Sequence, residues 1–141
     1  MSHIPVLYET VLEYLSVRAN GKYIDGTLGA GGHAAGILDR GGRVLGLDSD
    51  PNALALAQNN LARFGDHVFF VRSNFNRLAR VAREKNFFPA DGILLDLGIS
   101  SMELADHNRG FSFRSDGSLD MRFDPTAPTK ASDIVNHLSE K

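Results

Sequence analysis

The 141-residue sequence contains no cysteine and no tryptophan. Without cysteine the chain forms no disulfide and offers no thiolate to a metal ion, a composition that fits a reducing compartment. Long apolar runs are also missing, because no stretch approaches the roughly 18 residues that a membrane-spanning helix needs. The opening MSHIPVLYET lacks the basic start and the apolar middle of a signal peptide. We therefore expect a cytoplasmic protein.

An excess of basic charge is absent as well. The formal net charge is −2, so no overall positive field attracts nucleic acid, and an RNA partner would need a local patch. The five histidines show no metal-ligand spacing, and we predict no metal site. The hydrophobic share of 43% and the charged share of 23% are ordinary for a globular protein. We expect one domain over residues 1–141.

Short apolar runs alternate with helical patterns along the first two thirds of the chain. The runs KYIDGTL, RVLGLD, HVFFV and DGILLDLG have the length of strands and are apolar throughout, as in a parallel sheet buried on both faces. Helices are predicted for Val6–Val17, Gly32–Arg40, Pro51–Phe64 and Asn76–Lys85, and again for the tail ASDIVNHLSEK. This order predicts an α/β fold with a doubly wound, mainly parallel sheet. The composition changes only after Asp96, where glycine, serine, phenylalanine, arginine and aspartate replace the aliphatic runs.

Ligands of such sheets bind at the carboxyl ends of the strands. The four predicted strand ends carry Asp25, Asp48, Phe75 and Asp96, and a glycine-rich loop, DGTLGAGGH, follows the first strand. The loop matches the dinucleotide fingerprint G-x-G-x-x-G/A with Asp48 as a ribose-binding acid, although such loops are also plain turns.

The charge at the strand ends argues against a dinucleotide. A pyrophosphate is disfavoured beside Asp25 and Asp96, whereas the sulfonium and ammonium groups of S-adenosylmethionine are favoured there. Asp48 would accept hydrogen bonds from the ribose hydroxyls, and Phe75 would cover the adenine or belong to the core.

Six blocks of sequence make a more specific pattern. HIPVL, YIDGTLGAGGH, GLDSDP, DGILLDLGISS, NRGFSF and LDMRFDP follow one another from His3 to about Asp133. Together they resemble the bacterial 16S rRNA (cytosine-N4)-methyltransferase family, also called the MraW family. The resemblance implies a Rossmann-like class I methyltransferase fold, S-adenosylmethionine as the methyl donor, and a cytosine of small-subunit ribosomal RNA as the acceptor. Family members continue beyond this length, and the tail helix has no C-cap, so the domain looks truncated on its C-terminal side.

The resemblance also implies roles for single residues. The cofactor-binding residues would be Gly31, Gly32, His33, Asp48, Phe75, Asp96 and Glu103. His33 would contact the cofactor carboxylate with its ring or present its backbone amide. Two positions depart from the family, since Glu103 stands where a glutamine is usual and Met102 where a proline is usual.

Asp96 is our candidate catalytic residue. Cytosine N4 is a poor nucleophile, so an acceptor for its hydrogen is needed as charge develops, and Asp96 ends the fourth strand. The alternative is that Asp96 only binds the cofactor ammonium or orders the loop.

Arginines alternate with phenylalanines in NRGFSFRSDGSLDMRF, a pattern suited to phosphates and unstacked bases. Arg109 and Arg114 are the candidate RNA-binding residues, whereas Phe111, Phe113 and Phe123 would stack on bases or hold a loop to the core. Two other functions stay open: a catalytically silent module that binds S-adenosylmethionine or RNA, and an NAD-dependent oxidoreductase.

Overall fold

The computed structural model describes residues 5–114 and 116–139 and consists of two compact units, Met1–Asp96 and Leu97–Lys141. The division coincides with the change of composition after Asp96. His3, at the start of the first sequence block, lies outside the described residues. No helix in the described part is long and apolar enough to cross a membrane.

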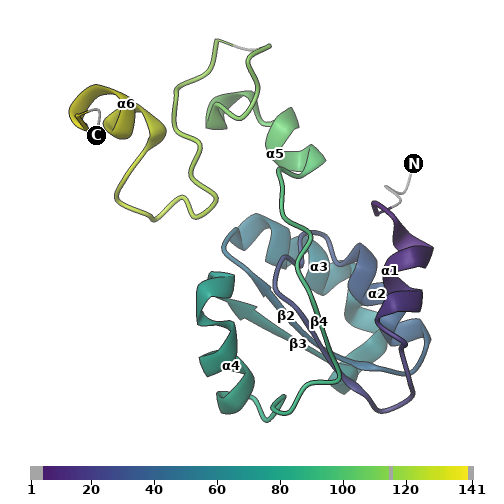
Figure 1. The fold of residues 1–141 in the computed structure, drawn as a ribbon. Coiled ribbons are helices and arrows are strands. Elements are labelled where there is room, and N and C mark those ends of the chain that lie inside the picture. Colours follow the sequence, from purple (N-terminus) through teal and green to yellow (C-terminus); the bar gives the residue numbers. More distant parts are fainter. Residues whose placement is uncertain (1–4, 115, 140–141) are drawn as a thin grey trace. The chain divides into compact units, whose positions relative to one another are not determined.

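The first unit contains a four-stranded sheet (Figure 1). Its strands are β1 (Lys22–Asp25), β2 (Arg43–Asp48), β3 (Val68–Arg72) and β4 (Gly92–Leu94), which lie in the order β3-β2-β1-β4. All three pairings are parallel, with Asp25 opposite Gly46 on β2 and Leu94 on β4. Three of the four strands fall within the predicted runs, β3 extends one residue beyond its run to Arg72, and the parallel α/β sheet is confirmed. The first strand has neighbours on both sides, which brings the ends of β1, β2 and β4 together.

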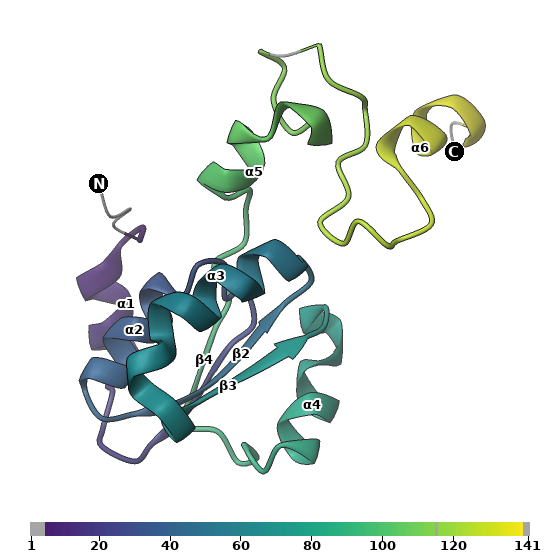
Figure 2. The same ribbon diagram turned by 180° about the vertical axis from the view of Figure 1, so that it is seen from behind.

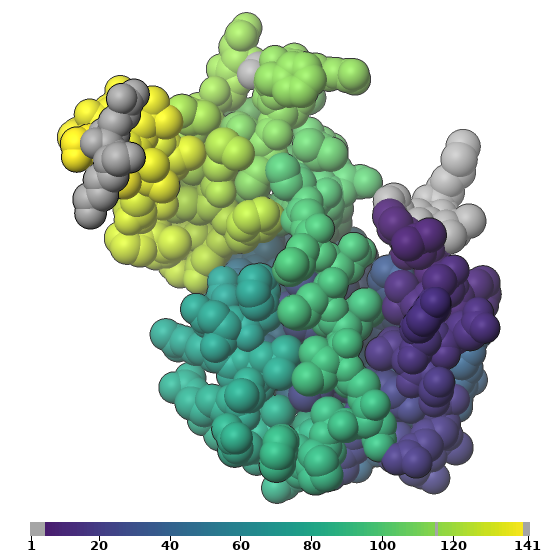
Figure 3. All heavy atoms as spheres, viewed as in Figure 1, coloured from purple at the N-terminus to yellow at the C-terminus, as the bar shows by residue number. Residues whose placement is uncertain are grey.

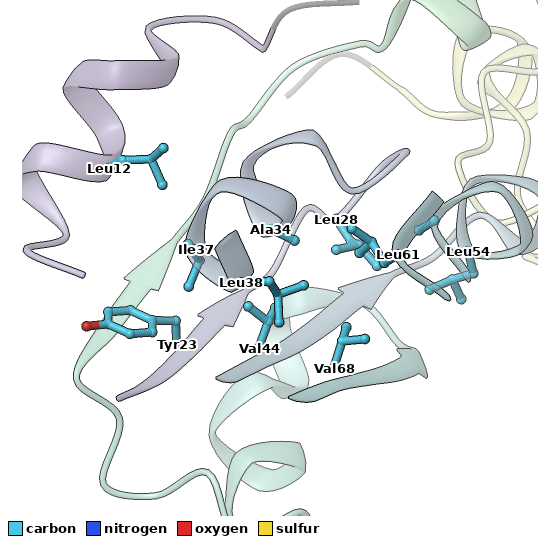
Figure 4. Close-up of a cluster of buried hydrophobic side chains, with 11 residues drawn as sticks. Leu12, Tyr23, Leu28, Ala34, Ile37, Leu38, Val44, Leu54, Leu61 and Val68 are labelled. Atoms are coloured by element: carbon cyan, nitrogen blue, oxygen red, sulfur yellow. The ribbon is translucent and has the colours of Figure 1, made fainter. Parts of the chain in front are cut away.

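Helices cover both faces of this sheet. Figures 1 and 2 show α1 (Tyr8–Tyr14), α2 (Gly32–Asp39) and α3 (Pro51–Leu61) on one face and α4 (Leu78–Glu84) on the other. Neighbouring strand residues point to opposite faces, so Tyr23 packs with the three-helix side and Ile24 with the α4 side. Figure 4 shows the first of these clusters, which includes Leu12 of α1, Ile37 of α2, Val44 of β2 and Leu61 of α3.

Capping explains where α3 begins. The Asp50 side chain accepts a hydrogen bond from Asn52 N, and Pro51 occupies the first turn of α3, as the sequence predicts. The predicted helix to Phe64 is shorter, because α3 ends at Leu61 and continues as a 3₁₀ segment, η1 (Ala62–His67), with a non-helical backbone at Gly65. Another 3₁₀ turn, η2 (Phe75–Arg77), precedes α4. The first helix is also shorter than predicted at both ends.

The edge strand β4 is poorly covered. Its Ile93 side chain is 53% exposed, and Leu95 just after the strand is 44% exposed. Figure 3 shows this segment in green, open at the surface between the purple α1 and the teal α4. The strand that leads to Asp96 is therefore fixed mainly by its pairing with β1.

The second unit has short helices joined by long loops. It contains α5 (Ser101–Ala105), the 3₁₀ turn η3 (His107–Arg109) and α6 (Ala131–His137). The last of these is the predicted tail helix. Phe111 is buried and packs against Phe123, with ring centroids 5.1 Å apart, whereas Phe113 is 97% exposed. The three phenylalanines therefore differ: Phe111 is buried, Phe123 packs against it while 43% exposed, and Phe113 faces solvent.

Candidate active site

The glycine-rich loop connects β1 to α2. Gly29 and Gly31 have φ values of +52° and +84°, which side chains other than glycine rarely adopt. A Cβ at Gly31 would lie 2.7 Å from Leu61 Cδ1, so this glycine lets the loop pack on α3. A Cβ at Gly29 would meet only a carbonyl oxygen at 4.0 Å. The loop is thus packed on one side and leaves space above Gly29.

Asp48, at the end of β2, ties this loop to the neighbouring strand. Its Oδ2 accepts a hydrogen bond of 2.8 Å from Gly29 N, and its Oδ1 accepts one of 2.9 Å from Asp50 N. Each carboxylate oxygen can accept more than one hydrogen bond, so a ligand hydroxyl can donate to Asp48 while both backbone bonds remain. The position fits the predicted ribose contact and adds a structural function, since Asp48 also holds the loop.

Asp25 is the most buried ionisable group of the site, with 1% of its surface exposed. Its Oδ1 accepts a hydrogen bond of 3.1 Å from Thr27 N. Burial raises the pKa of Asp25 to about 7; the bond from Thr27 opposes this shift, and the negative charges of Asp48 and Asp96 add to it. The carboxyl groups that end three strands are therefore close enough to repel one another.

Asp96 follows β4 with a half-exposed side chain. Its backbone N donates a hydrogen bond of 2.7 Å to Thr27 Oγ1, and its Oδ2 lies 3.9 Å from His33 Nδ1. The His33 ring is buried in the first turn of α2, where its Nε2 is 3.0 Å from the Val6 carbonyl oxygen and Tyr8 stacks on it. This arrangement favours the backbone amide of His33, rather than its ring, as the part that meets a ligand.

Phe75 is 42% exposed in the 3₁₀ turn after β3. A Cβ built on Gly26 would lie 3.3 Å from Phe75 Cβ, so the aromatic residue sits beside the end of β1. Of the two interpretations of Phe75, a ligand contact and a core position, its exposure favours the first.

Three predicted site residues belong to the second unit. Glu103 is buried and forms a capping box at α5, where its Oε2 accepts from Ser100 N at 2.7 Å and its own N donates to Ser100 Oγ at 3.2 Å. Arg109 Nη2 donates to the carbonyl oxygens of Arg122 and Phe123, at 2.7 and 3.0 Å. Arg114 is exposed. Glu103 and Arg109 thus stabilise the unit locally, and their ligand contacts remain predictions.

The carboxyl groups and free amides at the strand ends suit a ligand that carries positive charge and one carboxylate. Asp25, Asp48 and Asp96 concentrate negative charge at the strand ends, which a sulfonium or ammonium group would relieve. Gly31, the N-cap of α2, makes no side-chain capping bond, and among the described residues no side chain is bonded to the first amides of this helix, so these can receive a carboxylate. Within the described residues, no group of three histidine, aspartate or glutamate side chains is arranged to hold a metal ion.

Comparison with known proteins identifies the family of the chain. A profile of the MraW methylase family matches residues 1–141. The chain belongs to the MraW methylase family. This confirms the family resemblance on which the residue assignments rest.

The MraW family member has curated relatives that are considerably longer. It is 48% identical, over 141 residues, to the ribosomal RNA small subunit methyltransferase H of Carboxydothermus hydrogenoformans. It is 49% identical, over 142 residues, to the protein of the same name from Symbiobacterium thermophilum. Each alignment covers 99% of this chain and 45% of the relative. The chain therefore spans a little under half the length of these relatives.

A solved structure supports the fold of the MraW family member. A protein-L-isoaspartate O-methyltransferase superposes with a TM-score of 0.54 at 21% identity, covering 70% of this chain and 31% of that one. The predicted Rossmann-like class I methyltransferase fold is confirmed.

Proposed function

We propose that this protein is an S-adenosylmethionine-dependent methyltransferase that modifies the N4 amino group of a cytosine in 16S ribosomal RNA. The observation that carries the proposal is the meeting of three carboxyl groups, Asp25, Asp48 and Asp96, around a glycine loop at the strand ends. Membership of the MraW methylase family and the name of its relatives, ribosomal RNA small subunit methyltransferase H, support the reaction and the acceptor.

The residues divide between the two ends of S-adenosylmethionine. Asp48 accepts from the ribose hydroxyls and Phe75 lies on the adenine. The backbone amides of Gly31, Gly32 and His33 receive the methionine carboxylate at the start of α2. Asp96 would contact the ammonium group and the methyl group, and the cofactor contact of Glu103 is carried over from the family resemblance alone. When bound, S-adenosylmethionine supplies an electrophilic methyl group.

Asp96 prepares the nucleophile. The N4 lone pair of cytosine is delocalised into the ring, and a carboxylate that accepts an N4–H hydrogen bond keeps electron density on nitrogen. The same carboxylate would orient N4 in line with the methyl group. Correct orientation of two reacting groups can by itself remove a large part of the activation barrier. Asp96 is half-exposed, as a group that contacts an incoming base must be.

The second unit supplies the RNA contacts. Arg114 and Arg109 bind phosphates, and the fully exposed Phe113 stacks on an unpaired base. The Arg109 guanidinium also lies 5.3 Å from the centre of the Phe111 ring, so this arginine supports the loop that carries Phe113. Unit 2 therefore presents one aromatic side chain to RNA on a loop held by two others.

Methyl transfer to unmodified small ribosomal subunits tests the proposal. We expect labelled methyl groups from S-adenosylmethionine to enter the RNA and to appear as N4-methylcytidine after digestion to nucleosides. This chain and any longer form that its reading frame encodes should be assayed together. Label on another base, or no label with either form, would overturn the assignment. Binding of S-adenosylmethionine without transfer by either form would identify a silent binding module.

A further inference from the structure

Thr27 connects the glycine loop to the strand that ends at Asp96. The ladder between β1 and β4 pairs only three residues on each strand, ending with Asp25 opposite Leu94. One more backbone bond follows, from Gly26 N to Leu94 O at 2.9 Å. The next link is made by a side chain, because Asp96 N donates to Thr27 Oγ1 at 2.7 Å. The hydroxyl of Thr27 thus extends the pairing by one step, up to the proposed catalytic residue.

The backbone that carries this hydroxyl is itself fixed. Thr27 N donates to the buried Asp25 carboxyl at 3.1 Å, and Leu28 N donates to Leu47 O on β2 at 2.9 Å. Asp25 ends β1, which lies between two other strands, and is 1% exposed, so it cannot move without disturbing the core. A β-branched residue such as threonine also has few side-chain rotamers. Thr27 therefore offers an acceptor at a well-defined place.

The strand end that donates this bond has little other support. β4 is an edge strand of three residues, and the side chains of Ile93 and Leu95 are largely exposed. The Asp96 side chain is half-exposed, and His33 Nδ1 at 3.9 Å is beyond hydrogen-bond distance. The hydrogen bond from Asp96 N to Thr27, at 2.7 Å, is much shorter than the separation from His33. It holds the backbone from which the Asp96 carboxylate projects.

We propose that Thr27 is a positioning residue, whose hydroxyl holds the Asp96 backbone so that the Asp96 carboxylate faces the reacting amino group. The inference rests on the proposed function, since it assigns Thr27 a task in that reaction. Thr27 acts through Asp96 and touches neither the base nor the methyl donor in this role. Small displacements of reacting groups are costly, so loss of the hydroxyl should lower kcat by roughly ten- to hundredfold.

Two substitutions separate this role from a general effect on folding. Thr27→Val keeps the shape and removes the whole hydroxyl, including its bond to the Asp25 carboxyl, whereas Thr27→Ser keeps the hydroxyl and removes a methyl group. We expect the valine variant to lose kcat for methyl transfer while its Kd for S-adenosylmethionine changes less than about threefold, and the serine variant to regain most of kcat. Thr10→Val, on an exposed position of α1, is the matched control and should behave as the unsubstituted protein.

A measurement without turnover makes the test independent of the reaction. Amide hydrogen exchange should be faster at Asp96 in Thr27→Val than in Thr27→Ser, with unchanged protection of the central strand β2. Equal exchange at Asp96 in both variants, or unchanged kcat in the valine variant, would overturn the role of Thr27. If the unsubstituted protein shows no transfer, the proposed function fails, while the exchange experiment still decides whether Thr27 holds Asp96.

Discussion

His33 Nδ1 lies 3.9 Å from Asp96 Oδ2, so the start of α2 is close to the end of β4. The other ring nitrogen, Nε2, is 3.0 Å from the Val6 carbonyl oxygen. A carbonyl oxygen only accepts, so Nε2 carries the proton, and Nδ1 is the nitrogen that faces the carboxylate. The ring therefore connects the residues before α1 to the first turn of α2, whereas the candidate catalytic aspartate stays beyond hydrogen-bond distance of it.

Removal of the His33 ring should loosen the N-terminal helix. His33→Ala loses the bond to Val6 and the stacking of Tyr8, and we expect a loss of about 1–3 kcal/mol in the free energy of unfolding. Amide exchange should rise in α1 more than in α3. The exposed His67 is the matched control, and His67→Ala should change neither quantity. Equal exchange in α1 for both variants would contradict this structural role.

Asp25 should make stability depend on pH. Its pKa is about 7 in the folded chain and near 3.8 when unfolded, so between these values the folded chain holds a proton that the unfolded chain has released. The free energy of unfolding should therefore fall as pH rises from about 4 to about 7 and level off above, with a total change on the order of a few kcal/mol.

Asp25→Asn removes this titration and keeps an oxygen for Thr27 N. Denaturant unfolding at pH 5 and pH 8 should show a smaller difference for Asp25→Asn than for the unsubstituted protein. Asp66→Asn, on the exposed 3₁₀ segment, should leave the difference unchanged. If the free energy of unfolding changes equally with pH in Asp25→Asn and in the unsubstituted protein, the Asp25 carboxyl is not the source of the pH dependence.

The two candidate RNA-binding arginines should respond differently to truncation. Arg109→Ala removes the donor to two carbonyl oxygens and should destabilise the second unit by about 1–3 kcal/mol as well as weaken RNA binding. Arg114→Ala should leave stability unchanged and reduce the salt dependence of binding by roughly one phosphate contact. Thermal unfolding and RNA titrations at several salt concentrations distinguish these results. An unchanged salt slope in Arg114→Ala would remove it from the interface.

Asp48 and Asp96 should separate binding from transfer. We expect Asp48→Ala to weaken S-adenosylmethionine binding by roughly ten- to hundredfold, because a charge-assisted hydrogen bond and the loop anchor at Gly29 are both lost. Asp96→Asn should lower kcat by roughly 10²-fold or more while changing the Kd much less. Equal losses of binding and of transfer in Asp96→Asn would refute its catalytic assignment.

Much of the first unit could be predicted from sequence because its signals are local. Continuous apolar runs gave the parallel strands, Asp50 and Pro51 gave the start of α3, and the strand ends gave Asp25, Asp48 and Asp96 as neighbours. The place of the candidate site could thus be predicted from one rule, that ligands of parallel α/β sheets bind at the carboxyl ends of the strands.

Contacts with backbone acceptors and donors could not be predicted. Arg109 bonds to carbonyl oxygens of residues 122 and 123, and Thr27 accepts from Asp96 N, 69 positions along the chain. Backbone groups carry no residue-specific signal, so such partners appear only in the structure. Glu103 is a different case, because Ser100 three residues earlier is the signal of a capping box and predicts α5. The cofactor contact of Glu103 stays a prediction from the family resemblance.

Calorimetric titration with S-adenosylmethionine and, separately, with NAD tests the central claim most directly. The carboxylates at the strand ends favour the sulfonium cation and disfavour a pyrophosphate. We predict saturable heat with S-adenosylmethionine, weakened in Asp48→Ala and retained in Asp66→Ala, and no heat with NAD. No heat with S-adenosylmethionine, together with clear binding of NAD, would contradict the account.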